Sequence, residues 1–194
     1  PVEQVALSDL RRLFETNVVA MLHLSQAVLP GMRARGVGTI VNIGSIAGRF
    51  VTPGAGAYHI SKYGVTALSL ALRAEVRPFG VRVVLIEPTG VRDTSFFEAR
   101  IGAPRPGADH DPYADDDPYA QFKRGYEKTT GALAEMPVVT VPADTVARAV
   151  VRAIEAKDPK PRYLVGVSGK ASALARLLLT DRMWDRILMK GLRP

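Results

Sequence analysis

A tyrosine and a lysine lie four positions apart in "GAYHISKYG" (residues 56–64), as Tyr58 and Lys62. Side chains at positions i and i+4 share one face of a helix. Alone, both groups titrate near pH ~10, too high for acid–base work at neutral pH. A lysine cation held close to the phenol would stabilise the phenolate and lower its pKa. The tyrosine could then exchange a proton with an alcohol or a carbonyl oxygen near pH ~7.

The chain contains a second pair with the same spacing, Tyr119 and Lys123 in "YAQFK". Spacing alone therefore does not identify a proton-transfer pair, and the surroundings have to decide. Tyr119 follows three aspartates and a proline, and nearby carboxylates raise rather than lower the pKa of a phenol. We expect Tyr58, not Tyr119, to do chemistry.

Three other features point to the same place as Tyr58. Ser45 stands thirteen residues before it, where the apolar run "TIVNIG" ends, and Pro88-Thr89-Gly90 follows the next apolar run. In open parallel sheets, ligands bind beyond the carboxyl ends of the strands. Asn17 lies in the middle of a long helical pattern, although asparagine is a mediocre helix former.

Helical and strand patterns alternate along the chain. Ser8 is a plausible N-cap for the first helix, and the C-terminal tail forms one or two amphipathic helices that divide near Thr180-Asp181. The other predicted elements are a helix 8–35, a strand 39–44, a helix 57–79, a strand 81–87, a helix 143–156 and a strand 162–167.

Apolar strands that alternate with long helices predict an α/β fold with a Rossmann-like, doubly wound parallel sheet in one domain, 1–194. The phosphate-binding loops of such folds are missing. "GAGAYH" is not G-x-G-x-x-G, and Leu164 stands where "GVSGKAS" would need the first glycine of a P-loop. The chain is therefore either a different fold or a piece of a nucleotide-binding one.

Composition narrows the function classes. The chain has no cysteine, which excludes disulfides, zinc–thiolate sites and cysteine nucleophiles, and we expect no metal site and a cytoplasmic location. The net charge is +7, and residues 142–194 hold 11 Lys/Arg against 5 Asp/Glu. A solvated helix face explains this basic tail better than a membrane surface does. Nucleic acid binding is not expected, because no aromatic residues interleave a basic stripe.

Four separated segments, "LFETNV", "IVNIGSIAG", "AYHISKYGV" and "IEPTGVRDT", resemble the short-chain dehydrogenase/reductase family in order and spacing. The family signature is Asn, Ser and Tyr-x-x-x-Lys. The resemblance is closest to the hydroxysteroid/retinol-dehydrogenase-like branch, including "RYLVG" and the basic helical tail. In that family a glycine-rich turn and an N-N-A-G segment precede the position of Pro1. The resemblance thus implies the C-terminal part of a single-domain enzyme, without the first βαβ units and inactive by itself.

The resemblance also implies roles for the four signature residues. Tyr58 is the general acid/base, and Lys62 lowers its pKa and binds the nicotinamide ribose of NAD or NADP. Ser45 hydrogen-bonds the substrate oxygen. Asn17 kinks its helix and holds a water in a proton relay.

The segment after the second strand would contact the nicotinamide carboxamide. Here the chain departs from the family, because Thr89 replaces a usual glycine and Asp93 takes one possible threonine position. The candidate cofactor-binding residues are Tyr58, Lys62, Pro88, Thr89, Gly90, Val91 and Thr94.

The expected activity is the interconversion of a secondary alcohol and a ketone, with an apolar substrate and the polar, proline-rich segment 91–136 as a substrate lid. The expected assembly is a homodimer or homotetramer through helices 8–35 and 57–79. Two alternatives remain open. A sugar-nucleotide epimerase or dehydratase uses the same Tyr-x-x-x-Lys, although little chain follows Pro88 for its larger substrate domain. A non-catalytic, cofactor-sensing relative is the other.

Overall fold

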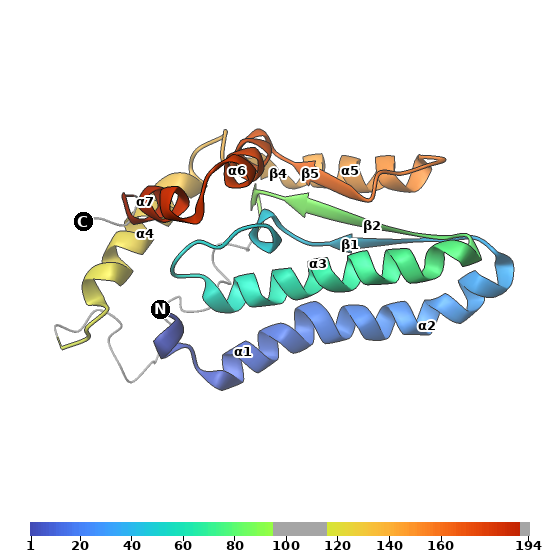
Figure 1. Ribbon diagram of the computed structural model, residues 1–194, viewed down its shortest axis with the longest axis horizontal. Coiled ribbons are helices and arrows are strands. Elements are labelled where there is room, and N and C mark those ends of the chain that lie inside the picture. Colours follow the sequence, from blue (N-terminus) through green and yellow to red (C-terminus); the bar gives the residue numbers. More distant parts are fainter. Residues whose placement is uncertain (95–115, 191–194) are drawn as a thin grey trace.

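The computed structural model describes residues 1–94 and 116–190, and it has a three-stranded parallel sheet at its centre (Figure 1). The strand order is β1 (Gly38–Ile43), β2 (Val81–Pro88) and β5 (Arg162–Val165). Ile43 of β1 pairs with Ile86, and Pro88 pairs with Val165 of β5. The predicted α/β fold with a parallel sheet is confirmed.

Helices cover both faces of this sheet. Strand β2 lies in the middle and is an almost uninterrupted apolar run, so its side chains are buried on both sides. Helices α2 (Ala20–Arg35) and α3 (Gly56–Val76) lie along one face, and α5 (Ala143–Glu155) lies on the other (Figure 1). The core on the α3 side is built around Val18, Val65 and Leu85, and that on the α5 side around Val84, Ile86, Ala153 and Val165.

The first long helix is not continuous. Helix α1 (Leu7–Phe14) passes into a π-helical turn, Glu15–Val19, before α2 begins. Its N-cap is Ala6 rather than the predicted Ser8, and no side chain caps it. Helix α2 ends at Gly36, which has a φ of 65°. Gly80 (φ 73°) lies so close to Gly36 that a Cβ atom would be 2.1 Å from the Gly36 carbonyl oxygen, which only glycine tolerates.

The segment predicted as a lid, 91–136, and the residues that follow it contain elements that the sequence did not reveal. Strands β3 (Gly90–Arg92) and β4 (Thr140–Pro142) form a small parallel pair, and α4 (Ala120–Ala134) is a regular helix. Residues 95–115 lie outside the described part of the chain, so the lid prediction is not tested there.

The C-terminal tail divides as predicted, into α6 (Val167–Leu178) and α7 (Asp181–Lys190). The ring of Trp184 in α7 packs edge-on against Phe50, with ring centroids 5.2 Å apart. In Figure 1, α4, α6 and α7 gather at the end of the molecule toward which β2 points. Within the described ranges, no helix is both long and apolar enough to cross a membrane.

Candidate active site

The predicted catalytic residues meet at the carboxyl edge of the sheet. Ser45 follows β1 directly, because Gly44 N–H still donates to Ile86 O (2.8 Å) and prolongs the strand pairing by one residue. Tyr58 lies in the first turn of α3, at the same edge. The Pro88–Gly90 turn ends β2 there as well. Elements separated by more than 40 positions thus converge as the sequence predicted.

Ser45 and Tyr58 are hydrogen-bonded to each other. Ser45 caps a short 3-10 turn, Ile46–Gly48, and its Oγ accepts a bond from Ala47 N–H at 3.1 Å. Burial raises the pKa of Tyr58, and the hydrogen bond from Ser45 partly offsets this. The two hydroxyls are therefore close enough to address one substrate oxygen together.

Lys62 lies one turn further along α3. Its Nζ is 5.7 Å from the centroid of the Tyr58 ring and donates to Ile43 O at 3.3 Å. Burial lowers the pKa of Lys62, because its charged form loses hydration. Burial of the phenol dominates and leaves the pKa of Tyr58 raised, so the expected lowering of that pKa by Lys62 stays a prediction.

Asn17 lies in the π-helical turn, which agrees with the expected irregularity of its helix. Its Nδ2 donates to Ser61 Oγ (3.0 Å), and Ser61 Oγ donates to the carbonyl oxygen of Tyr58 (2.8 Å). A π-turn inside a helix commonly marks a functional position. The structure thus ties Asn17 to the turn that carries Tyr58, while the water relay stays a prediction.

His59 has a structural role that sequence reasoning missed. Its Nε2 accepts a bond from Thr52 N–H (3.0 Å), so Nδ1 carries the proton and donates to Ala47 O (2.9 Å). The side chain is buried, and burial lowers its pKa. His59 therefore holds the turn that begins at Ser45 against α3. Its position beside Tyr58 was the one available sequence signal.

The strand-end residues are placed less favourably for a ligand. Thr89 is buried, and Cβ atoms added at Gly166 and Gly169 would lie 2.4 Å from its Oγ1 and 2.6 Å from its Cγ2. The Thr89 side chain thus packs against the start of α6, and its Oγ1 has no hydrogen-bond partner among the described residues. Thr94 is exposed and donates to Val91 O at 3.1 Å.

The second Tyr–Lys pair has a different environment. The Tyr119 hydroxyl donates to the carboxylate of Glu3, which raises the pKa of Tyr119. Lys123 pairs with Asp117, and this contact holds the pKa of that carboxyl well below its usual range. Tyr119 is half-buried and forms an edge-on contact with Phe122 at the start of α4.

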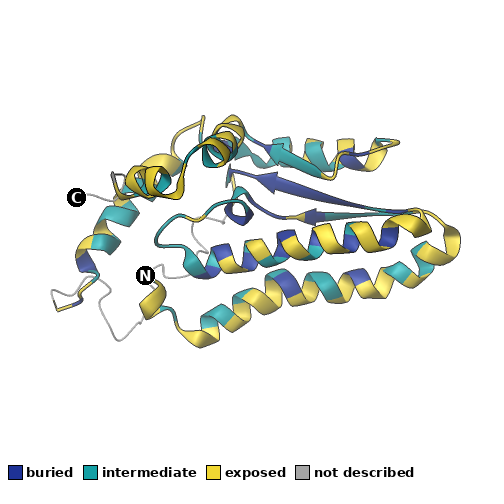
Figure 2. Ribbon diagram, in the orientation of Figure 1, coloured by how far each residue is buried: buried dark blue, intermediate teal, exposed yellow. Residues whose placement is uncertain are grey.

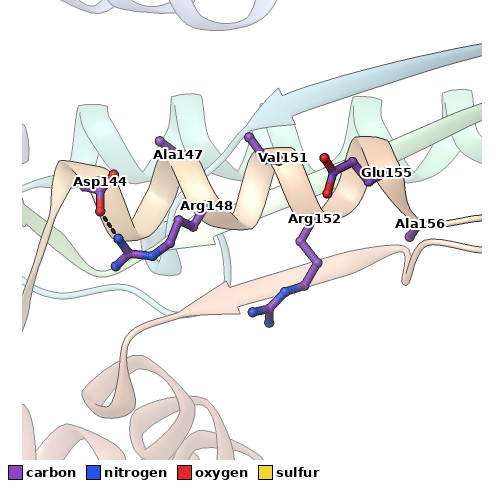
Figure 3. A pocket seen from close by; sticks show the side chains of 7 residues that line it. All are labelled: Asp144, Ala147, Arg148, Val151, Arg152, Glu155 and Ala156. Carbon is purple, nitrogen blue, oxygen red and sulfur yellow. Dashed lines mark ion pairs between the residues drawn. The ribbon is translucent and has the colours of Figure 1, made fainter.

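One depression on the surface of the described residues lies away from this site. It runs along α5 (Figure 3), which lies on the face of the sheet opposite α3 (Figure 1). The Asp144–Arg148 ion pair and exposed Val151 line it. None of the predicted site residues belongs to it. In the described part of the chain, no group of three or more His, Asp or Glu residues is placed to hold a metal ion.

The residues at the carboxyl edge fit the nicotinamide end of a cofactor. The Lys62 ammonium has three donors, of which one bonds to Ile43 O, so it can reach ribose hydroxyls beside Tyr58. Backbone groups of the Pro88–Gly90 turn lie at the same edge. The chemistry of these donors suits a neutral sugar and an amide.

Comparison with known proteins agrees with the geometry. Residues 1–102 match the family described as short chain dehydrogenase. The NADPH-dependent 3-dehydrocapnine reductase of Ornithobacterium rhinotracheale is 34% identical over 197 residues, covering 100% of this chain and 66% of that protein.

Two solved structures are similar in fold. A short-chain dehydrogenase from Streptomyces avermitilis has a TM-score of 0.66 and 27% sequence identity. The matched region covers 90% of this chain and 58% of the Streptomyces chain. A serine dehydrogenase complexed with NADP+ has a TM-score of 0.65 and 28% sequence identity, and the match covers 85% of this chain and 58% of that one. The chain spans less than two thirds of the length of these relatives. The Asn, Ser and Tyr-x-x-x-Lys residues stand in one site, and the chain belongs to the short-chain dehydrogenase family.

Proposed function

We propose that this chain carries the proton-transfer site of an NAD(P)-dependent oxidoreductase that interconverts a secondary alcohol and a ketone. The observation that carries the proposal is the hydrogen bond between Ser45 and Tyr58, with the Lys62 ammonium over the Tyr58 ring. Two hydroxyl donors beside one half-buried cation form a site that can bind a carbonyl oxygen and then deliver a proton to it.

In the reductive direction, Ser45 and Tyr58 donate hydrogen bonds to the carbonyl oxygen and stabilise the negative charge that develops there. A bound nicotinamide cofactor would supply the hydride for the carbonyl carbon. Tyr58 then gives its proton to the alkoxide oxygen. The resulting phenolate accepts a hydrogen bond from Ser45 and lies near the Lys62 cation. Because the raised pKa of Tyr58 keeps it protonated at neutral pH, the site suits reduction.

The relatives support the cofactor. One is named as NADPH-dependent, and one solved relative is complexed with NADP+. Lys62 would hold the nicotinamide ribose, and the backbone of Pro88–Gly90 would contact the carboxamide. Asn17 would complete the relay through water.

An apolar substrate is supported by two features. One is the resemblance to the hydroxysteroid/retinol-dehydrogenase-like branch. The other is α4, where the rings of Phe122 and Tyr126 stack with centroids 6.3 Å apart. Tyr126 also packs on Gly54, four residues before Tyr58, so that a Cβ there would be 2.5 Å from the ring. Helix α4 thus brings aromatic surface to the edge of the site.

The proposed assembly is a homo-oligomer through α2 and α3. The outer faces of these helices are largely exposed (Figure 2), and they carry Ala20, Leu24, Ala67 and Ala71. Leu68 of α3 does not lie on this outer surface, because it packs inward against the core around Val18, Val65 and Leu85. Small exposed residues would let two copies approach closely.

The test uses the protein expressed from its full open reading frame. NADPH and NADH oxidation would be followed by absorbance with a series of bulky, apolar ketones and small hydrophilic ones. We expect turnover of the bulky ketones and its loss in Tyr58→Phe. Turnover that survives Tyr58→Phe would refute the proposed role, and activity on small hydrophilic ketones alone would refute the substrate class.

A further inference from the structure

A buried carboxylate lies at the end of the central strand. Glu87 is 0% exposed and stands two residues before Thr89 in β2. Two arginines bind it. Arg49 donates from Nε to both carboxylate oxygens (3.1 Å each) and from Nη2 to Oε2 (2.7 Å). Arg162 donates from Nε to Oε2 (2.9 Å) and from Nη2 to Oε1.

The two arginines come from different elements, Arg49 from the turn that begins at Ser45 and Arg162 from β5. Arg49 closes the turn that begins at Ser45, because its N–H donates to Ile46 O at 2.9 Å. Its guanidinium therefore links that turn to β2. Arg162 is the first residue of β5 and reaches Glu87 across the strand pair.

The Ser45 turn is held on its other side by α3. His59 Nδ1 donates to Ala47 O, and Gly48 lies so close to α3 that an added Cβ would be 2.6 Å from Lys62 O. Contacts to β2 and to α3 thus fix a short turn whose first residue is Ser45. Within the described ranges, Arg49 is the side chain that ties this turn to the end of β2.

Stability alone does not account for such a cluster. Burying a carboxylate costs several kcal/mol in desolvation, roughly the amount that good pairing returns. A well-packed apolar group in its place is often as stable or more so. What a bidentate Arg–carboxylate pair adds is fixed geometry.

We propose that Arg49 and Glu87 are a positioning pair that fixes the Ser45 hydroxyl relative to Tyr58. Arg162 also binds Glu87, but it belongs to β5 and not to the Ser45 turn. The proposal rests on the proposed function, in which Ser45 and Tyr58 bind the same oxygen. A small displacement of Ser45 would weaken that joint contact without touching the cofactor, and misplacement by about 1 Å can cost about 10²-fold in rate.

The two arginines provide a matched pair of variants. Arg49→Met and Arg162→Met each leave Glu87 with one bidentate arginine, so their costs in stability are comparable. Only Arg49→Met releases the Ser45 turn. In the protein expressed from its full open reading frame, we expect Arg49→Met to lower kcat by about 10–10²-fold with the KM for cofactor unchanged. Arg162→Met should lower kcat at most about threefold, and Arg49→Lys should restore part of the loss.

A second readout does not depend on turnover. The Ala47 amide bonds to Ser45 Oγ, so hydrogen exchange at Ala47 and Gly48 should quicken in Arg49→Met and not in Arg162→Met. Equal losses of kcat in the two variants at equal Tm, or unchanged exchange in Arg49→Met, would overturn the proposal. If the wild-type protein turned over no ketone, the proposed function would fail, and the exchange data would still decide whether Arg49 fixes the turn.

Discussion

The ammonium of Lys62 lies over the ring of Tyr58, 5.7 Å from the ring centroid, while Ser45 hydrogen-bonds the phenol. In this arrangement burial raises the pKa of Tyr58, and Ser45 is the group that lowers it. The phenol is therefore protonated at neutral pH, ready to give a proton to an alkoxide.

The sign of the pH dependence follows from that raised pKa. Ketone reduction needs the phenol and should stay constant from neutral pH until it falls as the pH rises through the Tyr58 pKa. Alcohol oxidation needs the phenolate and should rise with pH toward the same value. Ser45→Ala removes the hydrogen bond that lowers the pKa, so the oxidation limb should move to higher pH. The measurement is kcat/KM against pH for both directions. A limb that moves to lower pH in Ser45→Ala would contradict this assignment.

His59 should make the fold sensitive to mild acid. Burial lowers its pKa from the ordinary value of 6.5, so protonation costs more in the folded chain than in the unfolded one. The stability is fully present above pH ~6.5 and is lost as the pH falls below that value toward and through the folded pKa. Thermal unfolding measured between pH ~7.5 and ~5 should show this loss in the wild type. The loss should be smaller in His59→Gln, which is less stable at neutral pH, and unchanged in His23→Gln, because His23 is exposed.

Thr89 has a buried hydroxyl that finds no partner in the described part of the chain. An unsatisfied buried hydroxyl destabilises, so Thr89→Val should raise the free energy of unfolding by about 1 kcal/mol. Thr130→Val is the control, because the Thr130 hydroxyl donates to Tyr126 O at 2.8 Å and its loss should not stabilise. Denaturant unfolding measures both. A destabilised Thr89→Val would show that the hydroxyl is satisfied in solution.

The regular elements could be predicted because their signals are local. Strand β2 is a continuous apolar run, and α5 repeats its apolar residues at helical spacing. The candidate active site could be predicted from the order and spacing of Asn17, Ser45, Tyr58 and Lys62 along the chain. What the sequence did not reveal is which polar groups meet across the chain. Glu87 is 38 positions from Arg49 and 75 from Arg162, and only the folded strand pairing brings them together. Helix α4 was missed because its flanks are rich in proline and acidic residues.

If α2 and α3 form the oligomer interface, a charged substitution on the outer face of α3 should weaken the assembly. Ala67→Glu places a carboxylate where two copies would meet, so it should shift the protein to a smaller species. Ala132→Glu, on the exposed side of α4, should leave the assembly unchanged. Sedimentation of the protein from its full open reading frame gives the answer. A wild-type protein that is monomeric at micromolar concentration would contradict the proposed interface.

The two Tyr–Lys pairs provide the most direct test of the site, because they share spacing and differ in surroundings. Both phenols have raised pKa values, so the pKa direction does not separate them. Their partners do: the Tyr58 hydroxyl is bonded to Ser45, with Lys62 over its ring, whereas Tyr119 donates to the Glu3 carboxylate.

A phenolate at position 119 would face a carboxylate and would be repelled, and Lys123 cannot help because it is paired with Asp117. At position 58 the new charge would meet a hydroxyl donor and a cation. Tyr58→Phe should therefore lower kcat by at least ~10²–10⁴-fold, the loss expected of a positioned acid, and Lys62→Met should do nearly as much. Tyr119→Phe should leave kcat nearly unchanged and alter KM at most, through α4. The measurement is kcat with a bulky ketone for both Tyr→Phe variants. Equal losses of kcat, or a larger loss in Tyr119→Phe, would mean that the catalytic role has been assigned to the wrong tyrosine.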